Sequence, residues 1–285
     1  MREPPRDLAS QVEAALREDI GSGDVTAALV PAAQRVRGSV ITRESAVLAG
    51  RPWVDAVFRH LDPHVQLVWH ANDGGPVAAN QVIFDIAGSA RAVLTGERTA
   101  LNFLQLLSAT ATVTRRFVEA VSGTGCAIID TRKTIPGLRS AQKYAVLCGG
   151  GHNHRMGLYD RILIKENHIA AAGSLGGAIR AARSHAPGMT VEAEVESLSE
   201  LEEALAAAPD IVMLDDFSLA DLRAAVALNR ARGQPVKLEA SGSVSLESVR
   251  AVAETGVDFV SVGSLTKHVR AVDLSMRLEF SAARP

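Results

Sequence analysis

The chain has 285 residues, of which 47% are hydrophobic and 22% are charged, as in an ordinary globular protein with a sizeable core. A formal net charge of −2 excludes a global field that would draw the protein to nucleic acid or to a membrane surface. The two cysteines, Cys126 and Cys148, form no redox or metal-like pair, the N-terminus is polar, and no apolar run approaches a membrane span. We therefore expect a soluble, cytoplasmic protein that binds neither nucleic acid nor membranes, and any anion binding must come from local clusters.

The first part of the chain mixes helical and strand-like segments. Helices are predicted over Leu8–Arg17 and from Glu97 to about Val121, with a loop at Glu18–Thr26. Four strand-like stretches lie between the helices: Arg35–Arg43, Ala46–Gly50, Val65–His70 and Gln81–Ser89. Near the end of the chain, Leu274 to Phe280 alternates apolar and polar residues, which predicts a half-buried strand that pairs back onto the N-terminal sheet.

From about Thr124 the chain repeats a short apolar strand followed by an amphipathic helix. The six strand candidates are Cys126–Thr131, Arg161–Asn167, Val191–Glu196, Ile211–Asp216, Val236–Gly242 and Phe259–Ser264. Four helices each begin at a serine that can cap them: Ser174, Ser197, Ser218 and Ser245. Such alternation requires parallel strands joined by right-handed crossovers.

A doubly wound sheet and an α/β barrel both satisfy this alternation. No strand runs into a Gly-x-Gly-x-x-Gly turn, so we favour the barrel, and because only six strands are found we expect it to be open on one side. The predicted fold is α/β: an N-terminal α/β sandwich domain over residues 1–110, joined by the tail 269–285, and an open barrel over residues 111–268 that carries the catalytic site.

Polar residues stand at the end of every barrel strand, where barrel enzymes place their catalytic groups. They are Thr131, Arg132, Lys133, Lys165, Glu194, Asp215, Ser241, Gly242, Gly263 and Ser264. Polar residues at one strand end mark only a transition to a loop, but six strand ends in register favour a site. In Val191–Glu196 the glutamates share one face, which predicts a wet, charged barrel interior.

Charge is also segregated along this half. Seven Lys or Arg and two acids lie between Thr131 and His168, whereas nine acids and no Lys or Arg lie between Glu192 and Asp216. A ligand with several negative charges suits the first block, and ribose hydroxyls or hydrated Mg²⁺ suit the second. The turns Ser241–Ser243 and Val262–Ser264 follow the last two strands, where such barrels bind a phosphate monoester. His152 and His154 lack the partners of a zinc site, and a Schiff-base role for Lys165, as in barrel aldolases, stays open.

Three segments carry a resemblance to a known family. They are GERTALNFLQ (Gly96 to Gln105), TRKTIPGLRSAQKYAV (Thr131 to Val146) and GGGHNHRMGLYDRILIKENHI (Gly149 to Ile169). These segments, together with EDIGSGDVT, EASGS and SVGSLT, resemble the quinolinate phosphoribosyltransferases over nearly the whole chain. The resemblance implies transfer of phosphoribosyl from 5-phosphoribosyl-1-pyrophosphate to quinolinate with decarboxylation, which gives nicotinate mononucleotide, pyrophosphate and CO₂ for de novo NAD biosynthesis.

The resemblance also implies the role of each site residue. Arg132, His154, Arg155 and Lys165 would hold the two quinolinate carboxylates, with Arg98 supplied by the partner subunit of a homodimer or higher oligomer with shared sites.

Lys133, with Lys165, would neutralise the departing pyrophosphate, and Glu194 and Asp215 would hold the ribose hydroxyls directly or through Mg²⁺ and water. Thr131 would also bind substrate. The 5′-phosphate site would consist of Ser241, Gly242, Ser243, Val262, Gly263 and Ser264.

Two positions depart from the family pattern, with Glu166 where we expect aspartate and Lys267 where we expect histidine. Two alternatives stay open besides the aldolase: a related transferase that uses nicotinate, and a regulator that binds phosphoribosyl compounds without catalysis.

Overall fold

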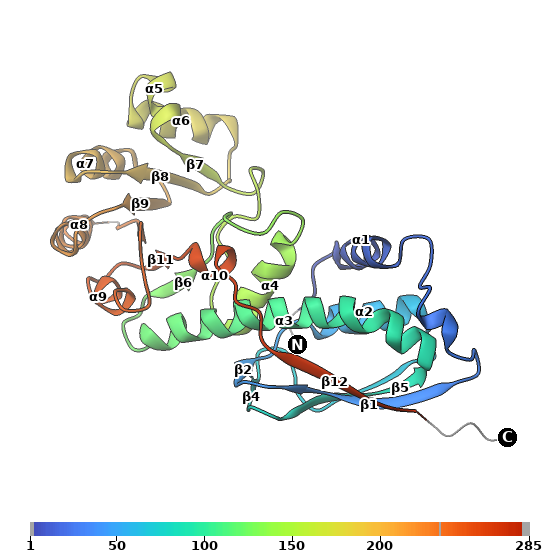
Figure 1. Cartoon of the computed structure of the whole chain (residues 1–285). Coiled ribbons are helices and arrows are strands. Elements are labelled where there is room, and N and C mark those ends of the chain that lie inside the picture. The colour runs from blue at the N-terminus through green and yellow to red at the C-terminus, as the bar shows by residue number, and fades with distance from the viewer. Residues whose placement is uncertain (1–2, 234, 281–285) are drawn as a thin grey trace. The chain divides into compact units, whose positions relative to one another are not determined.

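The computed structural model describes residues 3–233 and 235–280 (Figure 1). By its internal contacts the chain divides into two compact units, the first made of Met1–Arg115, Thr134–Gly150 and Leu265–Pro285, and the second of Arg116–Lys133 and Gly151–Ser264. Residues 134–150 lie inside the range predicted for the barrel, but their contacts group them with the first unit. Residues 1–2 and 281–285 of the predicted N-terminal domain and tail lie outside the described residues, and the domain limits stay a prediction.

The first unit is built on a four-stranded antiparallel sheet. Its strand order is β12 (Leu274–Phe280), β1 (Arg35–Thr42), β5 (Val82–Ser89) and β3 (Gln66–Trp69). Val40 at the centre of β1 pairs with Met276 on one side and Phe84 on the other. The predicted return of the C-terminal strand to this sheet is therefore confirmed. The segment predicted at Ala46–Gly50 contributes only β2 (Ala46–Val47), which pairs with the short β4 (Pro76–Val77).

Helices complete the first unit. They are α1 (Leu8–Ile20), η1 (Ala27–Leu29), α2 (Arg51–Leu61), α3 (Ala90–Ala120), α4 (Arg139–Gly149) and α10 (Ser264–Lys267). In Figure 1, α2 and α3 cover one face of the sheet. Trp53 and Phe58 of α2 belong to one buried cluster with Phe84 and Leu104, and this apolar layer is the core of the unit.

Helix α3 begins at Ala90, seven residues before the predicted start at Glu97. The prediction failed because Val93, Thr95 and Gly96 are poor helix formers. Gly96 is required by packing, since a Cβ at this position would lie 2.7 Å from Leu61 Cδ1 and 2.8 Å from Phe58 Cε1. Tertiary packing against α2 therefore outweighs the local preference.

The second unit is a six-stranded parallel sheet. Its order is β6 (Ala127–Ile129), β11 (Phe259–Ser261), β10 (Lys237–Ser241), β9 (Ile211–Asp215), β8 (Val191–Val195) and β7 (Ile162–Ile164). All six predicted strands are present, and each lies beside its neighbour in the chain except that β6 pairs with β11. Among the described strands β6 and β7 do not pair with each other, so the barrel is open, as predicted.

The helices of the second unit follow the strands. They are α5 (Glu166–Ala172), α6 (Leu175–His185), α7 (Leu198–Ala207), α8 (Leu219–Arg230) and α9 (Val249–Ala253). Three predicted serine caps are confirmed, because the hydroxyls of Ser174, Ser197 and Ser218 accept hydrogen bonds from backbone N–H groups three residues later. The fourth is wrong: α9 begins at Val249 with Ser248 as its N-cap, after a turn in which the Ser245 hydroxyl accepts from Ser248 N. None of the helices in the described residues is long and apolar enough to cross a membrane.

Candidate active site

The predicted site residues, apart from Arg98, all lie in the second unit, most of them at or just after the C-terminal ends of the parallel strands, while His154 and Arg155 lie in the segment before β7. Thr131 and Lys133 follow β6, Lys165 follows β7, and Glu194 lies within β8. Asp215 and Ser241 end β9 and β10 as paired neighbours. Because parallel strands end at the same edge of a sheet, the topology brings these side chains to one side of the unit.

Lys165 and Glu194 form an ion pair. Lys165 is also the N-cap of α5, where its backbone N–H donates to His168 Nδ1 over 3.0 Å and fixes the turn after β7. The Lys165 side chain is 42% exposed and that of Glu194 only 9%, so the lysine is the member of the pair that a ligand can reach. A cleft of about 270 Å³ lies beside this pair, with Glu166 and Glu196 in its wall.

The turn after β9 carries a backbone conformation that is unusual for its residue type. Asp216 has a φ of 53°, in the left-handed region, which costs on the order of 1 kcal/mol for a residue with a side chain. Its N–H donates to Ser241 O over 3.1 Å, which joins the turn to the end of β10. Non-glycine residues in this region occur preferentially at functional sites.

Gly242 continues the same junction. Its φ is 133°, and a Cβ at this position would overlap Asp216 Oδ1, so only glycine fits. The turn Ser241–Ser243 lines a cleft of about 270 Å³ together with Asp216. A close backbone approach of this kind is what a phosphate-binding turn requires.

The turns after β6 and β11 are also joined. Val262 N–H donates to Ile129 O over 3.0 Å, and Lys133 N–H donates to the Thr131 hydroxyl over 3.0 Å. The aliphatic part of Lys133 lies over Gly263, where a Cβ would come within 3.0 Å of Lys133 Cδ. Lys133 is exposed beyond this contact, so its ammonium group can reach a ligand at the strand ends.

Two guanidinium groups come together at Arg132 and Arg155. Burial lowers the pKa of Arg155, and the positive charge of Arg132 lowers it further. Like charges in proximity repel each other, and an anion bound between them relieves that repulsion. The pair is therefore suited to a carboxylate.

His154 lies deeper than the other predicted residues, at 8% exposure. Its backbone N–H donates to Asp130 Oδ1 over 2.9 Å, and its Nδ1 accepts from Arg155 N–H over 2.7 Å. Its Nε2 lies 2.8 Å from Glu192 Oε2 and 3.6 Å from Glu239 Oε2. Both ring nitrogens therefore face protein groups.

Glu192 and Glu239 are fully buried. Burial raises the pKa of Glu239 well above its ordinary value, and the charge of Glu192 raises it further. Burial also acts to raise the pKa of Glu192, but the hydrogen bond and charge of His154, helped by Glu239 and Arg161, lower it overall. The two pKa values are thus shifted in opposite directions, which favours the negative charge on Glu192 over Glu239.

The glutamates at this depth have no surface exposed to solvent, in contrast to the predicted wet interior. Sequence parity places Glu192 and Glu194 on one face but does not reveal that Glu192 lies against His154 and Glu239. Asp130 and Arg161 were also not selected from the sequence. A signal was present in the alternation of Glu192, Glu194 and Glu239 on strands that are otherwise apolar.

Two sets of residues have the donor atoms for a metal ion. Glu194 and Asp215 offer carboxylate oxygens at the ends of neighbouring strands, which fits Mg²⁺ held through its waters. His154, Glu192 and Glu239 each offer an atom within 4.8 Å of the others, but Arg161 NH1 lies 3.4 Å from Glu192 Oε2 and disfavours a second cation.

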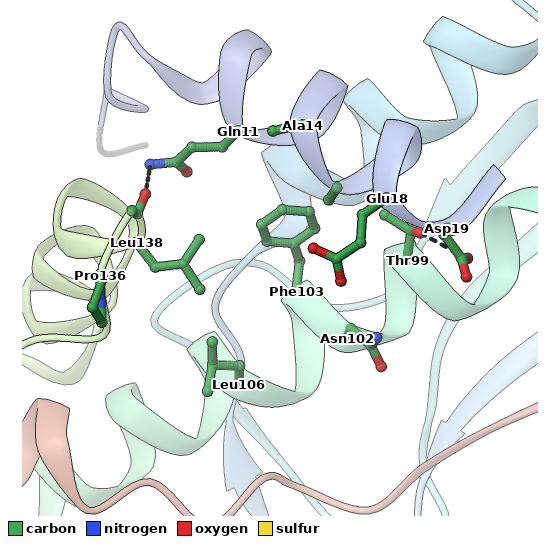
Figure 2. A pocket seen from close by; sticks show the side chains of 12 residues that line it. Gln11, Ala14, Glu18, Asp19, Thr99, Asn102, Phe103, Leu106, Pro136 and Leu138 are labelled. Atoms are coloured by element: carbon green, nitrogen blue, oxygen red, sulfur yellow. Dashed lines mark hydrogen bonds between the residues drawn. The ribbon is translucent and has the colours of Figure 1, made fainter. Parts of the chain in front are cut away.

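Arg98 lies on α3 in the first unit and is exposed. Near it, a cleft of about 420 Å³ runs between α1, α3 and residues 136–138 (Figure 2). Glu18 and Asp19 stand in its wall with Phe103 and Leu106, and its lining includes no Lys or Arg. An acid-lined cleft does not suit a dianionic ligand.

Comparisons with known proteins agree with the arrangement in both units. A family model described as quinolinate phosphoribosyl transferase, C-terminal domain, matches residues 110–277, and the corresponding N-terminal domain matches residues 24–108. The nicotinate-nucleotide pyrophosphorylase (carboxylating) of Mycobacterium leprae is 44% identical over 274 residues, which cover 94% of this chain and 95% of the relative. A probable enzyme of the same name from Bacillus subtilis is 42% identical over 265 residues, covering 93% and 91%.

Solved structures give the same result. The nicotinate-nucleotide pyrophosphorylase from Francisella tularensis superposes with a TM-score of 0.91 at 46% identity, over 97% of this chain and 98% of that one. NadC from Streptococcus pyogenes gives a TM-score of 0.93 at 40% identity, over 99% of both chains. The chain therefore belongs to the quinolinate phosphoribosyl transferase family.

Proposed function

We propose that this protein transfers phosphoribosyl from 5-phosphoribosyl-1-pyrophosphate to quinolinate and releases pyrophosphate and CO₂, leaving nicotinate mononucleotide for NAD biosynthesis. The observation that carries this proposal is the division of charge at the strand ends of the second unit. The guanidinium groups of Arg132 and Arg155 are close enough to repel, while the oxygen donors Glu194 and Asp215 lie on strands β8 and β9. The first set suits a dicarboxylate and the second suits a ribose.

The proposed steps need no protein nucleophile. The quinolinate ring nitrogen attacks C1′ of the ribose, and the bond between C1′ and the pyrophosphate oxygen breaks with its electron pair leaving on pyrophosphate. The carboxylate next to the ring nitrogen then leaves as CO₂, its bonding electrons remain at the ring carbon beside the positively charged nitrogen, and that carbon takes up a proton. Catalysis is by positioning and electrostatic stabilisation.

In this proposal the charged side chains divide the work, and Lys165 has two tasks. Arg132, Arg155 and Lys165 bind the quinolinate carboxylates, and Lys133 with Lys165 stabilises the departing pyrophosphate. Glu194 and Asp215 hold the ribose hydroxyls and stabilise positive charge at C1′ as the bond breaks. The turns Ser241–Ser243 and Val262–Ser264, with Thr131, bind the 5′-phosphate side of the substrate.

Magnesium, a homodimer and a cytoplasmic location belong to the same proposal. Mg²⁺ would partly neutralise the pyrophosphate charge, and the oxygen donors of Glu194 and Asp215 fit its preference. Arg98 is exposed on the first unit and would complete the site of the partner subunit. Cys126 and Cys148 form no disulfide, which suits a reducing compartment.

Turnover with defined substrates tests the proposal. Purified protein with quinolinate, phosphoribosyl pyrophosphate and Mg²⁺ should form nicotinate mononucleotide and release one CO₂ per turnover, measured by chromatography and ¹⁴CO₂ from labelled quinolinate. Formation of nicotinate mononucleotide only when nicotinate replaces quinolinate would identify the related transferase. Binding of phosphoribosyl pyrophosphate without any turnover would identify a regulator.

Lys165 separates the transferase from an aldolase-like enzyme. A Schiff-base lysine must attack as a free amine and leaves a reducible adduct, whereas Lys165 is an ammonium group paired with Glu194. Borohydride with each substrate should leave Lys165 unmodified by mass spectrometry. Lys165→Arg should retain part of the binding because the charge is kept, and Lys165→Met should lose more. A substrate-mass adduct on Lys165 would overturn the transferase mechanism.

A further inference from the structure

Beneath the strand ends, Glu192 of β8 and Glu239 of β10 form a buried carboxyl pair that has no part in the mechanism above. Both side chains are fully buried, and they lie on either side of β9. In register Glu239 shares its row with Met213 and Glu194, and Glu192 lies one step further from the strand ends. Glu239 is thus level with Glu194 and Glu192 is one row deeper, but both are closed off from solvent and so from a ligand at the strand ends.

The pair lacks the hydrogen bonds that buried polar groups usually make. Among the described residues, neither oxygen of Glu239, nor Oε1 of Glu192, accepts a hydrogen bond of ordinary geometry, and His154 Nε2 donates none, although it lies 2.8 Å from Glu192 Oε2. The polar groups that face Glu239 are the carboxyl group of Glu192, the hydroxyl of Ser261 and, at 3.6 Å, His154 Nε2, with the charge of Arg161 also acting on it. Buried groups left in this state are costly, and apolar residues of similar volume would pack the sheet at least as well. A purely structural role does not account for the pair.

The pair contacts two side chains beside the proposed site, His154 and Arg161. Glu192 Oε2 lies 2.8 Å from His154 Nε2 and 3.4 Å from Arg161 NH1. The other ring nitrogen of His154 accepts from the backbone N–H of Arg155 over 2.7 Å. Because Nδ1 is an acceptor, the ring proton lies on Nε2 and points at Glu192. The carboxyl pair thus fixes the ring, and the ring in turn holds the backbone of Arg155.

The same contacts continue on the other side of Arg155. Its guanidinium NH1 donates to Arg161 O over 3.5 Å, and Arg161 is itself paired with Glu192. Glu192 therefore restrains Arg155 through two neighbours, His154 and Arg161.

We propose that Glu192 and Glu239 are positioning residues, which fix His154 and Arg161 and through them the guanidinium of Arg155 for the quinolinate carboxylates. This inference rests on the proposed function of the site. A metal ion bound by His154, Glu192 and Glu239 is the competing explanation for the cluster. Against it, His154 Nε2 and Glu192 Oε2 are in direct contact at 2.8 Å, and Arg161 supplies positive charge to the same oxygen.

Kinetics with both substrates test the proposal. Glu192→Gln removes the charge that holds His154 and Arg161, so KM for quinolinate should rise by about ten- to a hundredfold, the range for loss of one charge-assisted hydrogen bond. KM for phosphoribosyl pyrophosphate should change by less than about threefold, since the ribose and phosphate groups are elsewhere. Glu239→Gln, which keeps the shape and a donor toward Glu192, should resemble wild type, whereas Glu239→Leu should raise KM for quinolinate.

A merely structural pair would give another result, namely fewer active molecules, and so a lower kcat with both KM values unchanged. That outcome, or equal rises in both KM values, would overturn the proposal. Glu202→Gln, an exposed acid on α7, is the matched control and should leave both KM values unchanged. If Glu192→Gln does not fold, as judged by circular dichroism, Glu192→Asp and Glu239→Leu carry the same comparison.

A measurement without turnover separates this inference from the proposed function. The ¹⁵N shifts of His154 in the wild-type protein should report a protonated Nε2 and an accepting Nδ1, and Glu192→Gln should abolish that pattern. If wild-type protein makes no nicotinate mononucleotide but this pattern is present, the proposed function fails and the positioning contact stands. One equivalent of a transition metal in the purified protein, removed by chelation together with the pattern, would overturn the positioning role.

Discussion

Asp73 of the first unit and Glu239 of the second are both carboxyl groups withdrawn from water, but their surroundings differ. Asp73 accepts from the backbone N–H groups of Gly50 and Arg51 at the start of α2 and from the Tyr144 hydroxyl. Glu239 accepts no ordinary hydrogen bond among the described residues and faces a second carboxyl group. Asp73 anchors the start of a helix. Glu239 belongs to a cluster whose burial costs free energy, and we attribute this cost to the positioning of His154 and Arg161.

The same contrast separates the two units as a whole. The first buries Trp53, Phe58 and Phe84 in an apolar layer, whereas the second buries Glu192, Glu239 and His154 beneath its strand ends. We interpret the first unit as a scaffold and the second as the unit that carries most of the active site. The predictions below test that division.

Arg98 is the strongest test of the division into scaffold and active-site unit. This residue belongs to the first unit and yet is proposed to bind quinolinate in the partner subunit. Arg98→Ala and Lys133→Ala chains should each be inactive. After subunit exchange at equal amounts, half of the dimers should be mixed, and each should contain one intact site, so about a quarter of the sites should regain activity. Activity is measured as nicotinate mononucleotide formed, with exchange verified by mass-tagged subunits. Proven exchange without recovery would refute the shared site.

Arg155 tests the second unit directly. Arg155→Ala removes a charge-assisted hydrogen bond of about 1.5–3 kcal/mol, so quinolinate binding should weaken by about ten- to a hundredfold. Binding of phosphoribosyl pyrophosphate, measured by calorimetry, should change much less. Arg183→Ala, an exposed arginine of α6 paired with Asp210, serves as the control. Equal loss for both ligands, or for neither, would contradict the assignment.

Asp73 tests the scaffold. Asp73→Asn should lower the free energy of unfolding by about 1–3 kcal/mol, because an amide cannot accept both helix-terminal N–H groups, and it should leave kcat/KM unchanged. Burial raises the pKa of Asp73 above its ordinary 3.8. A carboxyl whose folded pKa is raised contributes stability that is present below the unfolded value and lost as pH rises through the folded one. The difference between wild type and variant in urea unfolding should therefore be larger near pH 4 than at pH 7, and a difference that grows toward pH 7 would contradict this.

Cys126 gives the smallest expected effect. It precedes β6 and thus lies at the opposite end of the strands from Thr131 and Lys133. Burial raises its pKa to about 12, with Asp258 adding to the shift. At pH 8 its labelling by a thiol reagent should be on the order of a thousandfold slower than that of a free thiol, and Cys126→Ser should keep full activity. Rapid labelling with loss of turnover would mean that the chemistry extends to both ends of the sheet.

The sequence predicts those parts of the fold that are determined by interactions between residues close together in the chain. Continuous apolar runs such as Ile211–Asp215 indicate buried parallel strands, and serine caps such as Ser197 locate helix starts, because both signals lie within a few residues. The start of α3 could not be predicted, since Gly96 is helical only by virtue of its packing against Phe58 and Leu61.

The site shows the same limit. Strand ends and the family resemblance select residues such as Lys165 and Glu194, which the structure joins in an ion pair. Glu192 and Glu239 were visible as members of a polar face, but their depth and their relation to His154 depend on the register of three strands. Pairing register is a property of the folded sheet and not of any one segment.

The open barrel leaves two edge strands, and unpaired strand edges invite intermolecular pairing and aggregation. Here each edge strand, β6 and β7, is only three residues long. The outer side of β6 is further occupied by His152, whose N–H donates to Ile128 O over 2.9 Å and whose carbonyl accepts from Asp130 N–H over 3.1 Å. His152, two residues before His154, thus also covers an edge that could pair with another chain, so that protection from misassembly and the position of His154 depend on the same short stretch of backbone.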